Sequence, residues 1–435
     1  MKYYRIVTLG CKVNTYESES MANALEANNY HKADDDHQPD LIIVNTCSVT
    51  SASDGKSRQM IHREHKNYPN ALLIVCGCYS QMASNLISQI EGVKIIIGTK
   101  YRKELINLIN EYEMNKEQII KVDNSREDKE YERIMVSTYN DNTRAFIKIQ
   151  DGCNNFCSFC IIPYARGPVR SRPKEDILEE AKILVAKGFK ELVLTGIHTA
   201  GYGLDLKDYS FTDLLKDLLG VLPSYERIRI SSIEESEIPD ELIELISNDA
   251  RIVPHLHIPI QSGCDSVLKR MNRKYQTSDF ERMVRKIRAR IPNISLTTDV
   301  IVGFPGESEE EFKATVGFIK RIGFAALHVF PYSRRSGTVA DKMPNQIDPK
   351  IKKERVHELI ELSNELAKEY ASRFIGKELS ILFETYDEKT GLLTGHAPNY
   401  MKVSAKGNPN YLNNIKDVII DKSGYPLSYG HIKEE

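Results

Sequence analysis

Short apolar runs alternate with segments of helical spacing over the first part of this 435-residue chain, and that alternation restricts its fold. Four runs rich in Ile and Val are strand candidates, at 3–10, 40–46, 71–77 and 93–99. Helical patterns lie between them, at 15–28, 56–66 and 102–114. Apolar strands that alternate with helices form parallel sheets buried on both faces. We therefore predict an α/β fold with an N-terminal parallel α/β sandwich over residues 1–120.

A second alternating series follows a polar stretch, 115–142, which fits a linker. Its strand candidates are 143–150, 191–195, 226–231, 255–260, 295–302 and 325–330. Helical segments separate them, at 175–187, 211–221, 239–249, 278–290 and 308–322. Six such units fall short of the eight that close a barrel of about 250 residues. We predict an open (β/α)6 partial barrel over 139–370.

The pattern changes after a charged helix at 348–372. Short strand candidates separated by Gly, Asn and Pro follow, at 377–384, 391–396, 400–405 and 415–421. Short strands with such turns are typical of a small β-barrel, which we predict over 373–435.

Composition excludes several classes of protein. The 59 Lys and Arg nearly balance 61 Asp and Glu, so global charge does not indicate nucleic-acid binding. No apolar run approaches the ~18–20 residues of a membrane span, and "MKYYRIVTLG" lacks a signal peptide's apolar core. We expect a cytoplasmic protein with no membrane contact. Eight cysteines are too few for a disulfide scaffold, so clustered ones are expected to bind metal or do chemistry.

Three cysteines, Cys153, Cys157 and Cys160, lie within the segment "DGCNNFCSFC". One interpretation is a zinc site completed by Cys264 or a histidine. The other is a 4Fe–4S cluster on three thiolates, which leaves one iron with a free coordination position. The segment follows the first predicted barrel strand, at the end where barrel enzymes place their chemistry.

Cys11, Cys47 and Cys78 each follow the end of a predicted N-terminal strand. The carboxyl ends of parallel strands lie side by side and form a ligand-binding crevice, so these thiols could hold a second cluster. Cys76 is the competitor of Cys78, but it lies inside an apolar run, where a free cysteine behaves as a small hydrophobe. Unrelated core cysteines are the alternative.

The spacing of the Cys153 triad, with Phe159 before its last cysteine, resembles the radical SAM superfamily signature. Together with it, the segments "TLGCKVNTYES", "VNTCSVT", "GCYSQ", "HLHIPIQSGCDSVLKRMNRKY", "DVIVGFPGESEEEF" and "HVFPYSRRSGT" resemble the methylthiotransferases over essentially the whole chain. The resemblance implies two 4Fe–4S clusters, on Cys11, Cys47 and Cys78 and on the second triad. It also implies S-adenosylmethionine (SAM) as cosubstrate and an RNA-binding TRAM domain at the C-terminus.

By the same resemblance, residues at the ends of the barrel strands contact SAM. The residues expected to do so are Phe159, Gly196, Ser232, Glu234, Gln261, Asp299, Ile301 and Gly303. Ordinary polar loops at strand ends would look similar at any one of these positions.

"TLGCKVNTYES" with "FPYSRRSGT" is most similar to the branch that modifies tRNA threonylcarbamoyladenosine. The isopentenyladenosine branch usually has "GCQMN" and "SPRPGT", and the branch that modifies a ribosomal-protein aspartate usually has "GCPKN". The resemblance therefore implies methylthio transfer to carbon 2 of N6-threonylcarbamoyladenosine at tRNA position 37, with two SAM molecules. The other two substrates are the alternatives. Partners would be the tRNA anticodon loop and an electron donor such as a flavodoxin or ferredoxin, with the enzyme acting as a monomer.

Several arginines are candidate substrate contacts. Arg166 and Arg170 lie in the segment 161–174, which carries no acidic residue and could contact phosphates. Arg334 and Arg335 follow the last barrel strand, and a guanidinium pairs well with a carboxylate such as that of the threonylcarbamoyl group. A solvated surface is the alternative for such basic stretches. A two-cluster electron carrier and a zinc-dependent RNA-binding protein are the rival functions.

Overall fold

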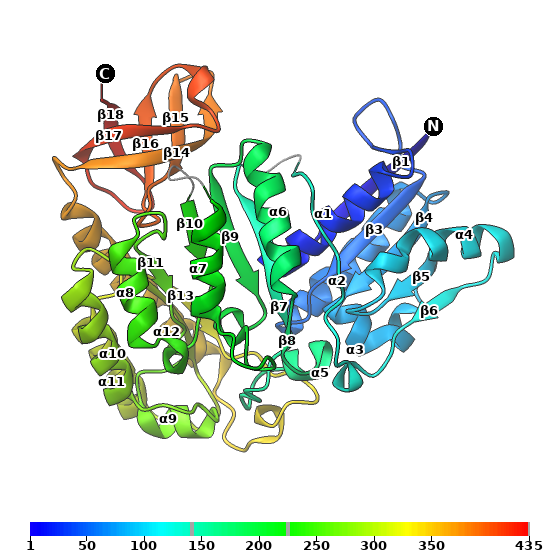
Figure 1. Ribbon diagram of the computed structural model, residues 1–435. Helices are drawn as coiled ribbons and strands as arrows, with labels where there is room; N and C mark the ends of the chain where they lie inside the picture. The colour runs from blue at the N-terminus through cyan, green and yellow to red at the C-terminus, as the bar shows by residue number, and fades with distance from the viewer. Residues whose placement is uncertain (140–142, 223–226, 434–435) are drawn as a thin grey trace.

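The computed structural model describes residues 1–139, 143–222 and 227–433. The chain folds into three parts (Figure 1). An N-terminal sandwich and a central barrel lie side by side, and a small C-terminal barrel lies at one end of the central barrel (Figure 1). No helix in the described part of the chain is both long and apolar enough to cross a bilayer.

The N-terminal sandwich has a six-stranded parallel sheet in the order β2-β1-β3-β4-β5-β6. Its strands are β1 (Lys2–Thr8), β2 (Tyr30–Lys32), β3 (Leu41–Thr46), β4 (Leu72–Gly77), β5 (Val93–Ile97) and β6 (Ile119–Lys121). The helices are α1 (Lys12–Glu26), α2 (Ser51–Asn67), α3 (Cys78–Ile87) and α4 (Leu105–Asn115). The apolar central strands β3 and β4 are almost wholly buried, as a parallel sheet covered on both faces requires.

The predicted linker is partly structured, which corrects our expectation for 115–142. β6 adds an edge strand to the sheet, and Ile134, Val136 and Tyr139 are buried in the core of the central barrel. The apolar run that contains Ile134 and Val136 is only three residues long, and it follows a strongly charged stretch, so no periodic signal indicated its burial. Residues 140–142 lie outside the described residues.

The central barrel has six parallel strands, which confirms the predicted open (β/α)6 architecture. They are β7 (Ala145–Asp151), β9 (Glu191–Gly196), β10 (Arg227–Ile230), β11 (His255–His257), β12 (Ser295–Val302) and β13 (Ala326–Pro331). Single bridges, Ile228 to Ile252 and Ser232 to His257, join β10 to the β11 side. A two-residue strand not predicted, β8 (Arg170–Ser171), runs antiparallel to β7. Residue 226 of the predicted third strand lies outside the described residues.

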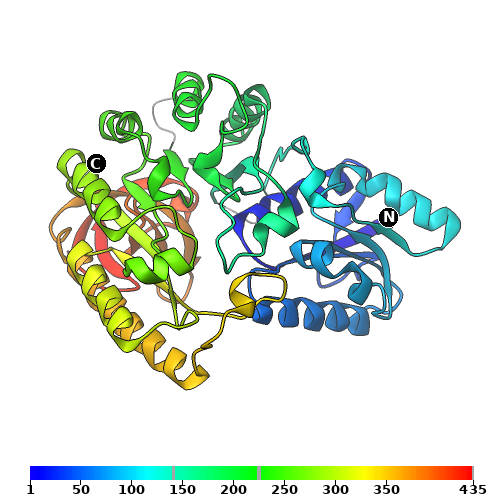
Figure 2. The same ribbon diagram turned by 90° about the horizontal axis from the view of Figure 1, so that it is seen from below.

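Helices cover the outside of this barrel (Figures 1 and 2). They are α6 (Lys174–Ala186), α7 (Phe211–Val221), α8 (Asp240–Asn248), α9 (Asp265–Arg270), α10 (Thr277–Arg290) and α11 (Glu309–Ile322), whereas α5 (Ile162–Arg166) packs against α3 of the sandwich. The segment after β13 crosses to the start of α2 in the sandwich, where the Ser51 hydroxyl donates to the Arg334 carbonyl at 2.8 Å (Figure 2).

After α12 (Pro349–Ser372), the chain forms a closed five-stranded barrel in the order β14-β15-β16-β18-β17. The strands are β14 (Glu378–Asp387), β15 (Leu392–His396), β16 (Lys402–Lys406), β17 (Ile415–Lys422) and β18 (Ser428–Ile432). The predicted small β-barrel is confirmed, but β18 was missed because its sequence "SYGHI" has little apolar alternation.

Candidate active site

The cysteines of the first triad lie at the carboxyl ends of three neighbouring strands. Cys11 follows β1, Cys47 follows β3, and Cys78 begins α3 directly after β4. Burial raises the pKa of the Cys47 thiol, with a contribution from Cys78, and burial likewise raises that of Cys78, with a contribution from Cys11. Each thiol therefore lies near another. The sheet brings together residues that are far apart in the sequence.

A glycine allows the first loop to approach Cys47. Gly10 has a φ of +114°, and a Cβ built on it would lie 2.9 Å from the Cys47 Cβ and 3.1 Å from its Sγ. A larger residue would be strained in this conformation and would press on the thiol.

Cys76 is the alternative to Cys78 as the third cysteine of the first triad. It is fully buried in an apolar cluster with Ile43, Ile74 and Ile95, and burial raises the pKa of its thiol to about 12. This environment suits a neutral core thiol, and Cys78 is the cysteine that borders the other two.

One buried guanidinium stands between the two parts of the molecule. Arg166, at the end of α5, donates from Nε to the Cys78 Sγ at 3.2 Å and from Nη1 to the Glu17 carboxylate at 2.6 Å. Its Nη1 also lies 3.2 Å from Asp151, two residues before Cys153. The backbone N–H of Cys153 donates to the Gly167 carbonyl at 3.1 Å. Arg166 and the next residue thus contact the neighbourhoods of both triads.

The second triad occupies one loop after β7. The Cys160 N–H donates to the Cys157 carbonyl at 2.9 Å, which folds the loop on itself. All three thiols are half-buried. Burial, together with the neighbouring Cys157 and Cys153, raises the pKa of Cys160 to about 12. Cys264 is the N-cap residue of α9, and its Sγ lies 3.2 Å from the Ser266 hydroxyl.

Two residues beside this triad were not found from the sequence. Arg273 is almost fully buried, pairs with Glu234, and places Nη1 3.4 Å from the Cys157 Sγ. His198 contacts Cys153 and pairs with Glu237. Both lie in loops that follow other elements, so no local spacing ties them to the cysteines.

The donor chemistry of both triads fits iron–sulfur clusters. Each offers three thiols within one small region, and each has a guanidinium on one sulfur, Arg166 on Cys78 and Arg273 on Cys157. A nearby positive charge favours the thiolate, which is the form that binds iron. Burial is the main cause of the raised pKa values of Cys47, Cys78 and Cys160, and the neighbouring thiols add to it.

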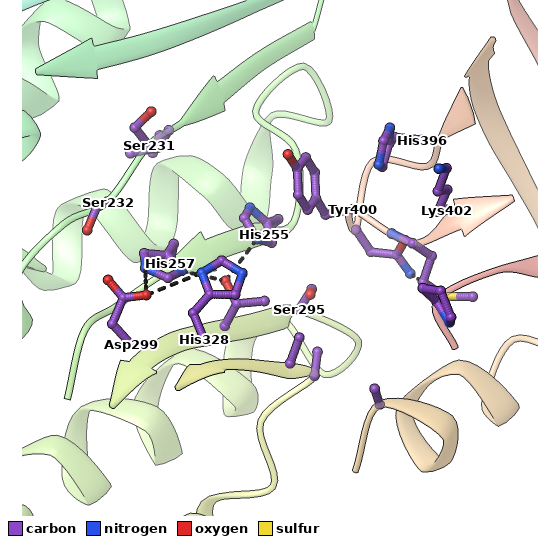
Figure 3. A pocket seen from close by; sticks show the side chains of 18 of the residues that line it. Ser231, Ser232, His255, His257, Ser295, Asp299, His328, His396, Tyr400 and Lys402 are labelled. Carbon is purple, nitrogen blue, oxygen red and sulfur yellow. Dashed lines mark hydrogen bonds and ion pairs between the residues drawn. The ribbon is translucent and has the colours of Figure 1, made fainter. Parts of the chain in front are cut away.

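A cavity of about 800 Å³ is lined by residues from all three parts of the molecule. Figure 3 shows its walls in the central and C-terminal barrels. Cys11 and Lys12 line it from the sandwich. The central barrel contributes Gly196, Ser231, Ser232, His255, His257, Asp299 and His328, and the C-terminal barrel contributes His396, Tyr400 and Lys402. A loop of the first triad therefore faces the same space as the inner side of the central-barrel strands.

Polar side chains gather on one wall of this cavity (Figure 3). The Asp299 Oδ1 lies 3.2 Å from His257 Nε2 and 3.3 Å from His328 Nδ1. Burial alone would raise the pKa of Asp299, but these two imidazoles hold it below its usual value. On the C-terminal side, the Tyr400 ring stacks between His255 and His396, with centroids 4.9 Å from each.

The predicted SAM residues divide into two groups. Gly196, Ser232 and Asp299 line the cavity. The others contact other parts of the chain. Glu234 pairs with Arg273, and the Gln261 carbonyl accepts from the Ile301 N–H at 2.8 Å. The Gly303 N–H donates to Glu307 at 2.5 Å, and Phe159 packs against the apolar cluster that contains Phe304. Their contacts to SAM stay predictions.

The structure corrects the role expected for three of the four arginines. Arg166 and Arg170 are buried among carboxylates, and Arg335 pairs with Asp54 of α2. The segment 161–174 contains no acid, but its partners come from distant parts of the sequence, so a local charge count misplaced it on the surface. Arg334 is exposed and pairs with Asp341 at 3.0 Å.

Comparison with known proteins agrees with this geometry. Residues 147–319 match the radical SAM superfamily, and residues 3–98 match an uncharacterized protein family, UPF0004. The chain is 47% identical over 97% of its length, and 94% of the relative's, to the threonylcarbamoyladenosine tRNA methylthiotransferase MtaB of Bacillus subtilis. The chain belongs to the radical SAM methylthiotransferase family. It is thus a radical SAM enzyme of the methylthiotransferase kind.

Other members of this family are similar over nearly the whole chain. The MtaB of Thermotoga maritima is 39% identical over 94% of this chain and 92% of its own length. The tRNA-2-methylthio-N(6)-dimethylallyladenosine synthase of Thermoanaerobacter pseudethanolicus is 36% identical over 99% of this chain and 93% of its own.

Among solved structures, the radical SAM methyltransferase TsrM of Kitasatospora setae has a similar fold. Its complex with cobalamin and a [4Fe-4S] cluster superposes with a TM-score of 0.57 over 91% of this methylthiotransferase and 81% of that chain, at 15% sequence identity. Identity this low shows a shared fold and nothing about the reaction.

Proposed function

We propose that this enzyme transfers a methylthio group to carbon 2 of the adenine in N6-threonylcarbamoyladenosine at tRNA position 37. It uses SAM and two 4Fe–4S clusters. The observation that carries this proposal is the shared cavity, because Cys11 of the first triad and the inner side of the central-barrel strands line the same space. A substrate carbon in that space is accessible both to a sulfur held near Cys11 and to a radical formed in the barrel.

The residues present suit both clusters. Cys153, Cys157 and Cys160 would hold one, and Cys11, Cys47 and Cys78 the other. When bound, such clusters supply the electron that cleaves SAM and an iron position at which sulfur can be held. The guanidinium groups of Arg166 and Arg273 favour the thiolate form of the ligands that they contact.

The cavity walls would bind and enclose the nucleoside. The Ser231 hydroxyl lines the cavity and has no hydrogen-bond partner in the described residues, so it is available to a bound nucleoside. Tyr400 and its two stacked imidazoles form a wall that limits the access of water. The target base must leave its stack in the anticodon loop, which costs roughly a few kcal/mol.

The C-terminal barrel supplies a second surface for the tRNA. Lys402 on β16 is exposed and lies at the cavity, where it is suited to contact a phosphate near the inserted base. We propose that the enzyme acts as a monomer in the cytoplasm and takes electrons from a flavodoxin or ferredoxin.

Nucleoside mass spectrometry tests this function. Anaerobically reconstituted enzyme, SAM and a reductant are incubated with tRNA that carries threonylcarbamoyladenosine at position 37. The expected product is heavier by one CH2S unit. The matched control is the same tRNA with isopentenyladenosine at that position, and turnover of the control alone would contradict the proposal.

The main alternative substrate is isopentenyladenosine. The relative named for a dimethylallyladenosine product is 36% identical, against 47% for the B. subtilis MtaB. Methylthiolation of a ribosomal-protein aspartate is the other alternative, and an assay with that protein in place of tRNA separates it.

A further inference from the structure

The cavity carries more positive than negative side chains. Among the described residues that line it are two lysines, Lys12 and Lys402, and one carboxylate, Asp299. Asp299 is already paired with His257 and His328. The lining therefore contains no carboxylate that is free to balance a lysine.

Lys12 is the cation nearest in sequence to the first triad. It is the first residue of α1 and directly follows Cys11. Its side chain keeps open surface and lies along the cavity. Within the described residues, its ammonium group has no hydrogen-bond or ion-pair partner. Neighbouring cations differ in this respect, since Arg144 pairs with Glu384 at 2.8 Å and Arg229 pairs with Glu191 at 2.6 Å.

The surroundings of Lys12 favour the arrival of an anion. The guanidinium carbons of Arg144 and Arg229 lie 5.5 and 4.7 Å from the centre of the Tyr400 ring, which lines the same cavity. The first turn of α1 contains no acidic residue, and its N-cap, Cys11, makes no side-chain cap. The helix dipole therefore adds to the positive potential at this end of the cavity.

We propose that Lys12 binds the carboxylate of the substituent on N6 of the target adenosine. This inference rests on the proposed function, because the substituent enters the cavity with the base that is modified beside Cys11. A carboxylate would neutralise the unpaired ammonium, whereas a hydrocarbon substituent would leave it unpaired. Lys12 thereby takes the role that the sequence suggested for Arg334 or Arg335.

The test compares two forms of one tRNA, which carry threonylcarbamoyladenosine either with its free carboxylate or as the methyl ester. The wild-type enzyme should have the higher kcat/KM for the free acid. Lys12→Gln should lower kcat/KM for the acid by about 10- to 100-fold, mainly through KM, and change that for the ester little. Because the ratio of the two values does not depend on the active fraction, partial loss of clusters does not affect it. Lys12→Arg should keep most of the preference.

Lys402→Gln is the matched control, because Lys402 lines the same cavity from the other side. It should keep the wild-type ratio, even if the KM for both tRNAs rises. Loss of the preference in Lys402→Gln but not in Lys12→Gln would overturn the proposal. So would an unchanged ratio in Lys12→Gln, or a rise in its KM for SAM without a change in the ratio. If wild-type enzyme methylthiolates neither form, the proposed function itself is wrong.

Discussion

The two cysteine triads are brought together in opposite ways. Cys153, Cys157 and Cys160 belong to one loop, whereas Cys11, Cys47 and Cys78 come together only because three parallel strands end at the same edge of a sheet. The second triad is a local property of the sequence, and the first is a property of the folded sandwich.

The arginines extend this contrast. Arg273 and Cys157 both belong to the central barrel, but Arg166 of the barrel contacts Cys78 of the sandwich. The first site thus depends on two parts of the molecule and on their contact. Damage to the fold or to the interface should affect the first site before the second.

The largest expected effect is the loss of both reactions in Cys153→Ala. Removal of one of three ligands should abolish cluster binding in the loop, so neither SAM cleavage nor methylthio transfer should be detected. Chromatography of 5′-deoxyadenosine measures the first reaction. Cys264→Ala is the control and should cleave SAM normally, since Cys264 lies outside the triad. Cleavage by Cys153→Ala would disprove the local assignment.

Cys47→Ala should separate the two reactions. We expect SAM cleavage to persist in the barrel, while methylthio transfer to tRNA falls below detection because the sulfur-holding site is lost. Both products can be quantified in one reaction. If this variant also loses SAM cleavage, the two sites are not independent.

Arg166→Met tests whether the first triad depends on the contact between the central barrel and the sandwich more than the second triad does. It leaves the buried carboxylates of Glu17 and Asp151 short of a partner, and removing one member of a buried ion pair costs about 3–5 kcal/mol. The thermal midpoint should fall, and the first cluster should be lost before the second. Arg170→Met is the control, because its nearest carboxylate oxygens are 3.9 and 4.0 Å away, and it should cost less. Equal losses in both variants would contradict this account.

Arg335→Ala should have a smaller effect on stability and activity. It removes a second contact between the central barrel and the sandwich. Arg335 pairs with Asp54 at the start of α2, next to the loop that carries Cys47. Its loss should cost about 1–3 kcal/mol and lower methylthio transfer more than SAM cleavage. Arg334→Ala, at an exposed position, should change neither reaction by as much. A variant of Arg335 with unchanged stability and activity would show that this contact does not position the Cys47 loop.

Cys76→Ala should have the smallest effect. It removes a buried sulfur from an apolar cluster, at a cost of about 1 kcal/mol, and should leave the iron content unchanged. Colorimetric iron analysis beside a denaturation curve measures both. A loss of iron would mean that Cys76, rather than Cys78, completes the first triad.

Strand and helix periodicity predicted most of the fold, and it failed where periodicity was absent. The apolar runs at 40–46 and 71–77 became β3 and β4 with bounds within one residue or two. β6 and β18 were missed because each is short and mixes polar with apolar residues. The sandwich and the open barrel followed from alternation, which is set by burial on both faces of a parallel sheet.

The placement of the cysteines could be predicted because strand ends are visible in the sequence. The partners of the charged residues could not, because charge pairing depends on contacts between distant segments. Arg166 meets Glu17 across 149 residues, and Arg335 meets Asp54 across 281. Lys12 directly follows Cys11 in the sequence, but only the structure shows that its side chain lines the cavity.

Iron analysis of two proteins tests the central claim, that the chain holds two clusters, each on three thiolates. Wild-type enzyme reconstituted without oxygen should bind about eight irons per chain, and the variant with Cys11, Cys47 and Cys78 all changed to Ala about four. Mössbauer spectra of both should show 4Fe–4S clusters. About four irons in the wild type, or no loss of iron in the variant, would contradict the account.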